Sequence, residues 1–305
     1  MSGASRTTVY VKLVLMALFW GATFIGGRVA TAEIPPAVAA LWRYGIAAVA
    51  LVVVVYAVEG GLPRLAAREW KAVVLLGATG VLIFSLCFMY GLALVPASRG
   101  SLIMALNPAV TLVASAVIFR EHLTRNKVLG VVIALVGVIV VLGRGDLAHL
   151  FSGGIGAGEI ILFGCPVSWA IYTLAAKHLL PKRSALAVTA YASLVGSAML
   201  VVVTAAIGSL VPPAASWQAW GAVAFTGLFG TAVSLVWFYE GVRAIGAART
   251  SVFINLVPVF AIALGVMLLG EALEASMLIG GAIVIAGIYL LNRPERARAV
   301  PAAAE

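Results

Sequence analysis

Charged residues are scarce in this chain of 305 residues, because Asp, Glu, Lys and Arg together make up only 10% of it. Soluble domains carry about a quarter of their residues as charged ones, so an ordinary soluble domain is excluded. Cysteine is scarcer still: Cys87 and Cys165 are the only two, and both lie within apolar stretches. This placement indicates buried, inert thiols and excludes a framework of disulfides between loops.

The chain also lacks a set of residues that could carry out chemistry. His122, His149 and His178 fall in separate loops, so no metal site is indicated. No Ser/His/Asp set or pair of carboxylates shares one depth, and the Gly-x-Gly spacing in SGGIGAGE (152–159) follows no strand. We therefore expect neither an enzyme nor a bound cofactor.

Long apolar runs fill the rest of the sequence, which is 63% hydrophobic with a mean hydropathy of +1.13. A run of about 20 apolar residues can cross a bilayer as a helix. In hydrocarbon every backbone polar group needs an internal partner, so these runs must be helical. We expect an all-α integral membrane protein with ten spans, at about 9–30, 36–58, 70–94, 97–119, 127–143, 155–179, 184–208, 217–241, 247–269 and 275–292.

The net charge of +9 comes from basic residues that gather on one side of these spans. With the N-terminus placed in the cytoplasm, sixteen Lys and Arg residues fall inside and only Arg28, Arg99 and Arg144 fall outside. This bias follows the positive-inside rule, so the charge indicates orientation in an inner (cytoplasmic) membrane and no binding to nucleic acid. We expect both termini in the cytoplasm. The first span should be retained, because its apolar run is longer than that of a signal peptide.

The sequence repeats itself between its two halves at a nearly constant offset. Arg99, Ser101, Pro108 and Glu121, which are scarce residue types here, meet identical residues at 249, 251, 258 and 271. Each half holds five spans, an odd number, so the second half must enter the membrane from the opposite side. Such an inverted repeat is typical of secondary transporters, with the binding site near the midplane, although a duplication kept only for packing is the alternative. We place the first repeat at 1–146, the second at 147–292 and a cytoplasmic tail at 293–305.

Two stretches share one pattern: YGLALVPASRGSLIMALNPAVTLVASAVIFREHLTRNKVLGVVIALVGVIVV (90–141) and YEGVRAIGAARTSVFINLVPVFAIALGVMLLGEALEASMLIGGAIVIAGIYLL (239–291). Each contains a helix ending in Tyr and Gly, a short turn, a Pro-bearing helix that closes on Glu-x-Leu, and a Gly-rich helix. The pattern, together with Trp20-Gly21 and Arg43, resembles the EamA-type branch of the drug/metabolite transporter superfamily. Length and span number are similar to those of the YddG-like amino-acid exporters. The resemblance implies a membrane transporter with amino acids among its expected substrates.

Polar residues inside spans usually face the interior of the bundle, so their positions indicate where a solute could bind. The fifth and tenth spans carry almost none, and their glycine pairs, Gly130/Gly137 and Gly280/Gly287, suggest close packing and make these spans a candidate homodimer contact. The candidate substrate-binding residues around a central cavity are Trp20, Thr23, Ser85, Tyr90, Ser101, Met104, Trp169, Tyr172, Thr173, Ser234, Trp237 and Asn255. The three tryptophans among them could equally be packed core aromatics.

Pro108 and Pro258 lie in the middle of apolar stretches. Proline has no N–H for the carbonyl four residues earlier, on Met104 and Ile254, so each should bend its helix. A membrane tolerates such a bend where neighbouring groups or cavity water satisfy the carbonyl. The two bends either flank the central cavity or serve packing alone, and both interpretations place them at mid-membrane.

Arg43 is the only charge well inside a span, roughly two turns from its outer end. It is either a structural anchor bonded to carbonyls or a contact for an anion or carboxylate. No Asp or Glu lies at the midplane, so we expect transport down a gradient, or coupling without a central acid.

The leading hypothesis is an exporter of amino acids or similar small metabolites that works by alternating access. The alternative within the same superfamily handles drugs or anionic metabolites such as phosphorylated sugars, which would require several deep cations. An intramembrane enzyme or a sensor without transport is disfavoured by the missing catalytic set and the missing soluble domain. The expected partners are a small-molecule substrate and the lipid bilayer.

Overall fold

The computed structural model describes residues 6–120, 124–143, 155–179, 183–208 and 214–291, and the regular elements there are all helical. The predicted tail at 293–305 lies outside the described residues. The elements of the first repeat are α1 (Arg6–Thr31), α2 (Pro36–Glu59), α3 (Ala67–Leu76), η1 (Gly77–Ile83), α4 (Phe84–Leu94), α5 (Ala97–Met104), α6 (Asn107–Phe119) and α7 (Arg125–Leu142). Those of the second are α9 (Ala157–Leu179), α10 (Ala185–Ala206), α11 (Trp217–Gly227), η3 (Leu228–Val233), α12 (Ser234–Ile245), α13 (Ala247–Val252), η4 (Phe253–Asn255), α14 (Leu256–Leu269) and α15 (Ala275–Leu291).

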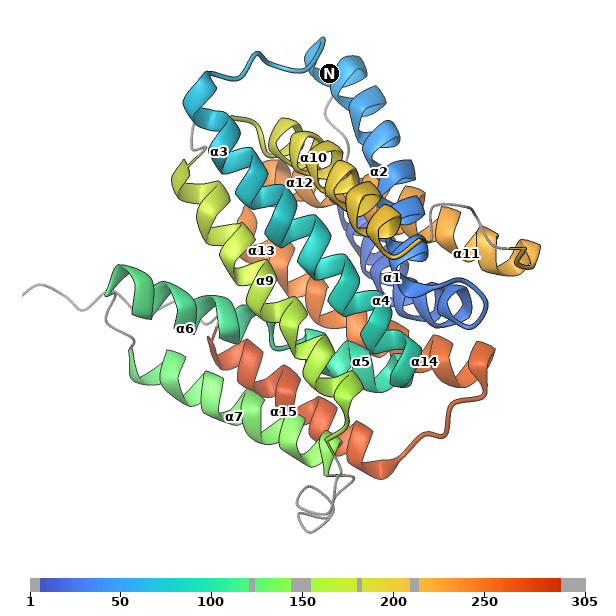
Figure 1. Cartoon of the computed structure of the whole chain (residues 1–305). Helices are drawn as coiled ribbons and strands as arrows, with labels where there is room; N and C mark the ends of the chain where they lie inside the picture. Colours follow the sequence, from blue (N-terminus) through green and yellow to red (C-terminus); the bar gives the residue numbers. More distant parts are fainter. Residues whose placement is uncertain (1–5, 121–123, 144–154, 180–182, 209–213, 292–305) are drawn as a thin grey trace, which may run out of the picture.

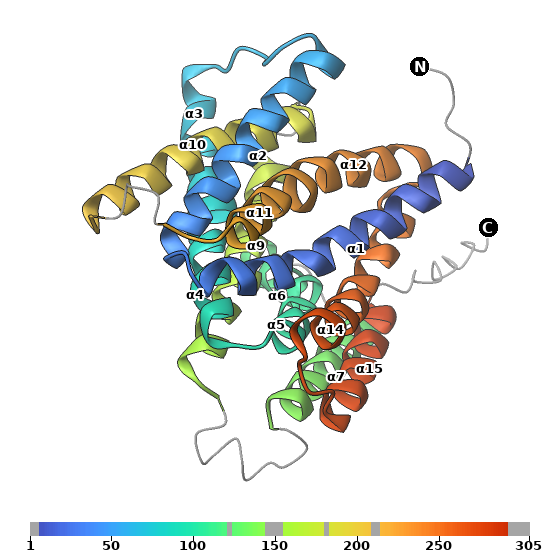
Figure 2. The same ribbon diagram turned by 90° about the vertical axis from the view of Figure 1, so that its right-hand side faces the viewer.

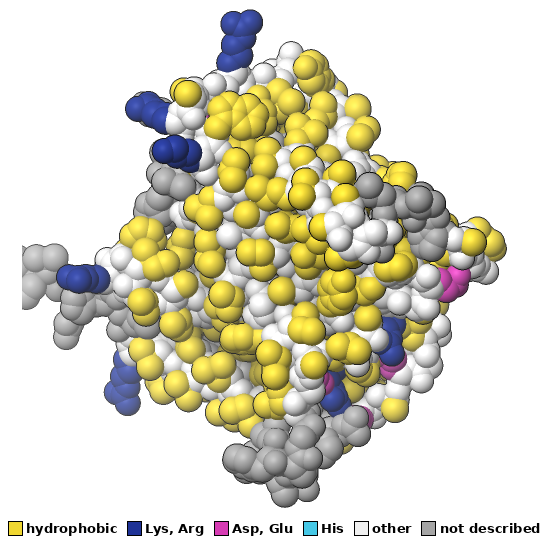
Figure 3. Space-filling model, in the orientation of Figure 1, with side chains coloured by type: hydrophobic (Ala, Val, Ile, Leu, Met, Phe, Trp, Pro, Cys, Tyr) yellow, Lys and Arg dark blue, Asp and Glu magenta, His cyan; other side chains and the backbone are white. Residues whose placement is uncertain are grey.

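The ten predicted spans correspond to these helices. Nine helical segments of the described chain are long and apolar enough to cross a bilayer, and α15, with 17 residues, is a shorter apolar helix. Large hydrophobic side chains point outward from them, among them Met267 at 77% and Val117 at 73% exposure. Figure 3 shows an apolar surface across the middle of the molecule, as a lipid-facing surface requires.

Apart from Arg43, the charged side chains of the described residues lie toward the two ends of the bundle. One end, here called the acidic face, carries the loop after α1, the start of α9 and the loop after α14, with Glu33, Glu159, Glu271 and Glu274. The other, the basic face, carries the loops before α3, α7 and α10, with most of the Lys and Arg residues. Figure 3 shows basic side chains along one edge and acidic ones near the opposite edge. Successive spans run between these two faces in alternating directions, so the basic loops fall on one face, as the charge pattern of the sequence predicts.

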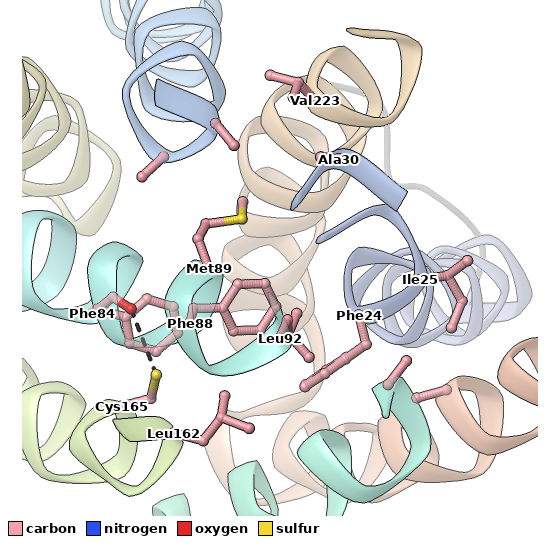
Figure 4. Close-up of a cluster of buried hydrophobic side chains, with 14 of the residues drawn as sticks. Phe24, Ile25, Ala30, Phe84, Phe88, Met89, Leu92, Leu162, Cys165 and Val223 are labelled. Carbon is pink, nitrogen blue, oxygen red and sulfur yellow. Dashed lines mark hydrogen bonds between the residues drawn. The ribbon is translucent and has the colours of Figure 1, made fainter. Parts of the chain in front are cut away.

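The two repeats are interleaved. In the first repeat α1 packs against α11, α12 and α14 of the second, and α9 of the second packs against α4, α6 and η1 of the first (Figures 1 and 2). Figure 4 shows the largest apolar cluster, in which Phe88 and Leu92 of α4 meet Phe24 of α1 and Leu162 of α9. In a bilayer such contacts depend on close van der Waals packing, since lipid is as apolar as the side chains.

Helices α7 and α15 lie side by side at one edge of the bundle (Figure 1). A Cβ added to Gly137 would lie 2.6 Å from the carbonyl oxygen of Gly280, and one added to Gly130 would lie 2.7 Å from that of Gly287. The close packing predicted from these glycines is confirmed. Because the glycines meet within one chain, they are not the surface that a second copy would contact, and the homodimer stays a prediction.

Candidate functional site

The fourth and ninth spans are each broken in mid-membrane. The fourth divides into α5 and α6 at Ala105–Leu106, and the ninth divides into α13 and α14 through the short 3₁₀ segment η4. Pro108 and Pro258 lie in the first turn of α6 and near the start of α14. A missing N–H costs little at a helix start, so each proline begins a new helix. The helical pattern is thus interrupted beside both prolines, by a turn in the fourth span and by a 3₁₀ segment in the ninth, and the bends themselves stay a prediction.

The two breaks make different contacts at the two faces. At the acidic face α5 packs against α14. The repeat relates α5 to α13 and α14 to α6, yet no contact of similar extent joins α13 to α6 within the described chain. The repeats therefore have non-equivalent arrangements, with the broken spans closed together at the acidic face.

Glu271 is the main polar tie in this closure. Its carboxylate accepts hydrogen bonds from the backbone N–H groups of Ala97 (2.6 Å) and Ser98 (2.9 Å), and from the Ser98 hydroxyl. These are free N–H groups at the start of α5, where the helix dipole also favours a negative charge. One carboxylate after α14 thus caps the helix that begins the other broken span.

Two arginines complete the acidic face. Arg99 is 5% exposed and lies between Glu159, at 3.2 Å, and Glu274, at 3.9 Å. Arg28 donates from Nη1 to the carbonyls of Leu92 (2.8 Å) and Ala93 (2.7 Å) at the end of α4. A hollow of about 390 Å³ opens beside Arg28 and Glu33, with Leu269 of α14 in its wall.

Hydrogen bonds join loops at both faces, at positions that the repeat relates to each other. At the acidic face Glu33 accepts bonds from Ser216 N and Oγ, both 2.7 Å, at the start of α11; these bonds lower the pKa of Glu33. At the basic face Arg183, the repeat equivalent of Glu33, donates to both carboxylate oxygens of Glu69 (2.7 and 2.8 Å), which raises the pKa of Arg183. Glu69 also accepts a bond from the backbone N–H of Ala66, the repeat equivalent of Ser216. Loops related by the repeat are therefore held together at both faces, whereas the broken spans are packed together at the acidic face.

The third and eighth spans each contain a wide π-helical turn, η1 and η3. A Cβ on Gly80 of η1 would lie 2.2 Å from the ring of Tyr172, and one on Gly230 of η3 would lie 2.2 Å from Thr23 Cγ2. Each wide turn thus packs tightly on the first span of the other repeat. Such turns often mark functional sites. These wide turns were not predicted from the sequence, although Gly77 and Gly80 recur at the repeat offset as Gly227 and Gly230.

The three candidate tryptophans lie where the repeats meet, half-buried. Trp169 lies 5.6 Å from Phe84 and 5.2 Å from Tyr172, measured between ring centroids. Trp20 lies 5.8 Å from Phe238. Trp237 stacks on Phe19 at 5.6 Å. Trp20 and Trp237 thus contact aromatic rings on each other's helices, α1 and α12, whereas Trp169 contacts rings on α4 and on its own helix α9.

Most candidate hydroxyl groups already have partners. Three of them donate to carbonyls of their own helical segments: Thr23 to Trp20 (2.6 Å), Ser101 to Ser98 (2.7 Å) and Ser234 to Phe229 (2.6 Å). Tyr172 reaches Thr189 at 3.4 Å, and Thr189 reaches Tyr239 at 2.8 Å, so a row of hydroxyls links α9, α10 and α12. Ser85 differs, because its hydroxyl is fully buried and has no hydrogen-bond partner in the described chain.

The remaining candidates are dispersed. Met104, Thr173 and Asn255 are half-buried on α5, α9 and η4. Tyr90 is 41% exposed on α4, and its place in a central site stays a prediction. An apolar stretch has the same composition on its lipid face and its core face, which is why the sequence could not orient this tyrosine.

Arg43 lies in the core of the bundle at 5% exposure. Its guanidinium carbon is 4.9 Å from the centre of the Phe88 ring and 5.3 Å from that of Tyr44. Its Nε and Nη1 atoms have no hydrogen-bond partner in the described chain. The interpretation of Arg43 as an anchor bonded to carbonyls therefore lacks support at these two atoms.

Comparison with known proteins gives the chain a family. The model of the EamA-like transporter family matches twice, at residues 7–143 and 156–293. An uncharacterized transporter of Bacillus subtilis, YyaM, is 29% identical over 283 residues, which is 92% of each chain. A "probable terminal-alkyne amino-acid exporter" of Streptantibioticus cattleyicolor is also 29% identical over 283 residues, again 92% of each. A crystal structure with 20% identity superposes with a TM-score of 0.64 over 94% of this chain and 96% of its own, and so shares the fold.

Proposed function

The chain belongs to the EamA-like transporter family, and on that premise we propose that it exports amino acids or similar small metabolites by alternating access. Transport itself follows from the family. The solute, the direction and the mechanism are the proposal.

The observation that carries the mechanism is the difference between the two broken spans. Half-helices α5 and α14 pack together at the acidic face, whereas their repeat equivalents, α13 and α6, do not pack to a similar extent at the basic face within the described residues. In an inverted repeat, exchanging the conformations of the two repeats would exchange these contacts. The exchange would open the acidic face and close the basic one, which is the two-state change that alternating access needs.

The loop ties supply the fixed part of this mechanism. Glu33–Ser216 and Arg183–Glu69 join equivalent loops at opposite faces in the same way. Contacts that are already equivalent do not need to change when the repeats exchange conformations. The moving part is then confined to the broken spans and to the wide turns η1 and η3, which lie in the spans directly before them.

The proposed solute class rests on two features. The relative from Streptantibioticus cattleyicolor is named as an amino-acid exporter, at 29% identity. The residues where the repeats meet combine tryptophan, tyrosine and serine, which suit a solute with an apolar side chain and a polar head. Positively charged side chains gather at the basic face, so we place that face, with both termini, in the cytoplasm of a cell with this protein in its inner membrane.

The absence of a midplane acid shapes the proposed energetics. Within the described chain the carboxylates lie at the two faces, at Glu33, Glu159, Glu271 and Glu274 on one and Glu59, Glu69 and Glu240 on the other. No carboxylate of these residues is therefore placed to carry a proton through the centre. We expect solute to move down its own gradient.

Purified protein in proteoliposomes tests the proposal. Counterflow of a labelled amino acid is measured against unlabelled amino acids, phosphosugars and cationic dyes on the other side, with and without an imposed pH gradient. Exchange of several amino acids, unaffected by the pH gradient, supports the proposal. Exchange of phosphosugars or dyes alone, or a steep dependence on the pH gradient, contradicts it.

A further inference from the structure

Arg43 combines charge, burial and unused donors in one side chain. It is 5% exposed, and its Nε and Nη1 have no hydrogen-bond partner among the described residues. The contacts that it does make are with the rings of Phe88 and Tyr44. A ring face attracts a cation, but it does not satisfy N–H donors that lie in the plane of the guanidinium. These donors are available to a group that the chain does not supply.

No carboxylate of the described chain acts as a counter-ion for Arg43. Each one is bound elsewhere: Glu33 to Ser216, Glu59 to Ser184, Glu69 to Arg183, Glu159 and Glu274 to Arg99, Glu240 to Lys12, and Glu271 to the start of α5. An unpaired cation in a low-dielectric interior is costly, since buried charges are normally paired. An anion that arrives from outside the chain would relieve that cost.

Further donor groups lie on or near the helical turns that carry the rings contacted by Arg43, since Ser85 is one turn before Phe88 on α4. The Ser85 hydroxyl, fully buried on α4, has no hydrogen-bond partner among the residues described. The Tyr44 ring lies beside the Arg43 guanidinium, and the Tyr44 hydroxyl donates a long bond of 3.4 Å to the Gly80 carbonyl. The buried Cys165 thiol of α9 donates to the Phe84 carbonyl of α4 at 3.5 Å. A carboxylate only accepts hydrogen bonds, so it complements a group made of guanidinium and hydroxyl donors.

Arg43 lies next to the wide turn η3, one of the segments that we propose to move during transport. A Cβ added to Gly227 would lie 2.5 Å from the Arg43 carbonyl oxygen, so α2 of the first repeat touches α11 of the second directly before the wide turn η3. Phe88 of α4, whose ring contacts Arg43, packs in turn on Phe24 of α1 at 5.2 Å between ring centroids (Figure 4). The donors therefore lie where the repeats meet and are covered while the acidic face is closed.

We infer that Arg43, together with Ser85, binds the carboxylate of the transported solute when the repeats separate at the acidic face. The inference rests on the proposed function and narrows it to solutes with a free carboxylate. The planar fork of the guanidinium matches a carboxylate bidentately, and the buried site makes each of these charged hydrogen bonds strong.

The test compares wild type with Arg43→Met, which keeps an unbranched, flexible side chain in place of the arginine stem and removes the guanidinium and its charge. Ser193→Ala is the matched control, because Ser193 is the repeat equivalent of Arg43 and is also buried without a hydrogen-bond partner in the described chain. In proteoliposomes the uptake of the labelled amino acid that wild type moves fastest is measured. Unlabelled competitors are that amino acid and its amide, which keeps the side chain and amine but has no carboxylate.

The inference predicts that Arg43→Met raises the KM of the amino acid about 10- to 100-fold, the loss expected from removing a charged hydrogen bond. Competition by the amide should be equal in wild type and variant, and Ser193→Ala should behave as wild type. Equal losses for acid and amide, or an unchanged KM in a monodisperse variant, overturn the inference and leave the proposed function standing. Wild type that moves no amino acid overturns both. Arg43→Lys provides the same comparison if Arg43→Met does not fold, with a smaller KM increase expected because lysine lacks the fork.

Discussion

Replacing Glu271 by glutamine should open the acidic face. The carboxylate accepts hydrogen bonds from Ala97 N at 2.6 Å, Ser98 N at 2.9 Å and the Ser98 hydroxyl, all at the start of α5. Glutamine keeps one acceptor oxygen, turns an amide group toward N–H donors and removes the charge that favours a helix start. We expect a loss of about 2 kcal/mol in the closed state, from one charged hydrogen bond and the helix dipole. That loss corresponds to a shift of about 30-fold in the equilibrium between closed and open acidic faces.

Thiol accessibility measures this shift. Ser101→Cys, buried on α5 at 1% exposure for the wild-type serine, is introduced after Cys87 and Cys165 have been replaced by alanine. The rate of reaction with a membrane-impermeant maleimide at the acidic face should rise at least tenfold with Glu271→Gln. Glu274→Gln is the control, because its ion pair with Arg99 is long, at 3.9 Å, and Arg99 keeps its closer partner Glu159 at 3.2 Å, so less than a twofold change is expected. An unchanged rate with Glu271→Gln, or an equal rise with Glu274→Gln, would refute the role given to Glu271.

Three further predictions concern the aromatic residues, the glycine contact and pH. Trp20→Ala and Trp169→Ala should each lower counterflow at least tenfold without changing the elution of the purified protein. Trp70→Ala, at an exposed position, should leave counterflow unchanged. Full activity in both the Trp20 and the Trp169 variant would assign these two rings to packing alone. Gly137→Val should lower the free energy of unfolding in detergent by about 1–3 kcal/mol through overpacking against α15, whereas Gly45→Ala, where an added Cβ meets nothing within 4 Å, should leave it equal or slightly higher. The hydrogen bonds from Ser216 depress the pKa of Glu33 in the folded protein. The stability that they contribute is therefore complete above the ordinary glutamate pKa and is lost as the pH falls through the folded pKa. Thermal melts should show a smaller drop in melting temperature on acidification for Glu33→Gln than for wild type, and identical pH profiles would contradict the assignment.

The membrane architecture could be predicted from the sequence because its causes are local. Apolar length sets each span, and matched prolines at 108 and 258 mark the two breaks. Proline alone was not sufficient, since Pro166 lies inside α9 without ending it. Recurrence at the repeat offset distinguished the two prolines that divide a span.

The details of the site depend on long-range contacts that no local pattern contains. Glu271 caps a helix whose first residue lies 174 positions earlier, and its partner groups are backbone N–H atoms, which leave no trace in residue type. The wide turns η1 and η3 have no strong propensity of their own and form where glycine allows close packing. The same limit explains Tyr90, which an apolar periodicity could not assign to lipid or core. For Arg43 the sequence left two roles open, and its unpaired donors in the structure favour the anion contact.

Reciprocal motion at the two faces is the most direct test of alternating access. Spin labels at Leu94 and Met267 report the acidic face, and labels at the repeat-related Ala244 and Val117 report the basic face; all four positions are exposed. Under counterflow with a transported amino acid, pulsed electron-paramagnetic-resonance distances should show the first pair moving apart in the same fraction of molecules in which the second pair moves together. Distances that change in the same direction at both faces, or that stay constant while solute exchanges, would contradict the account.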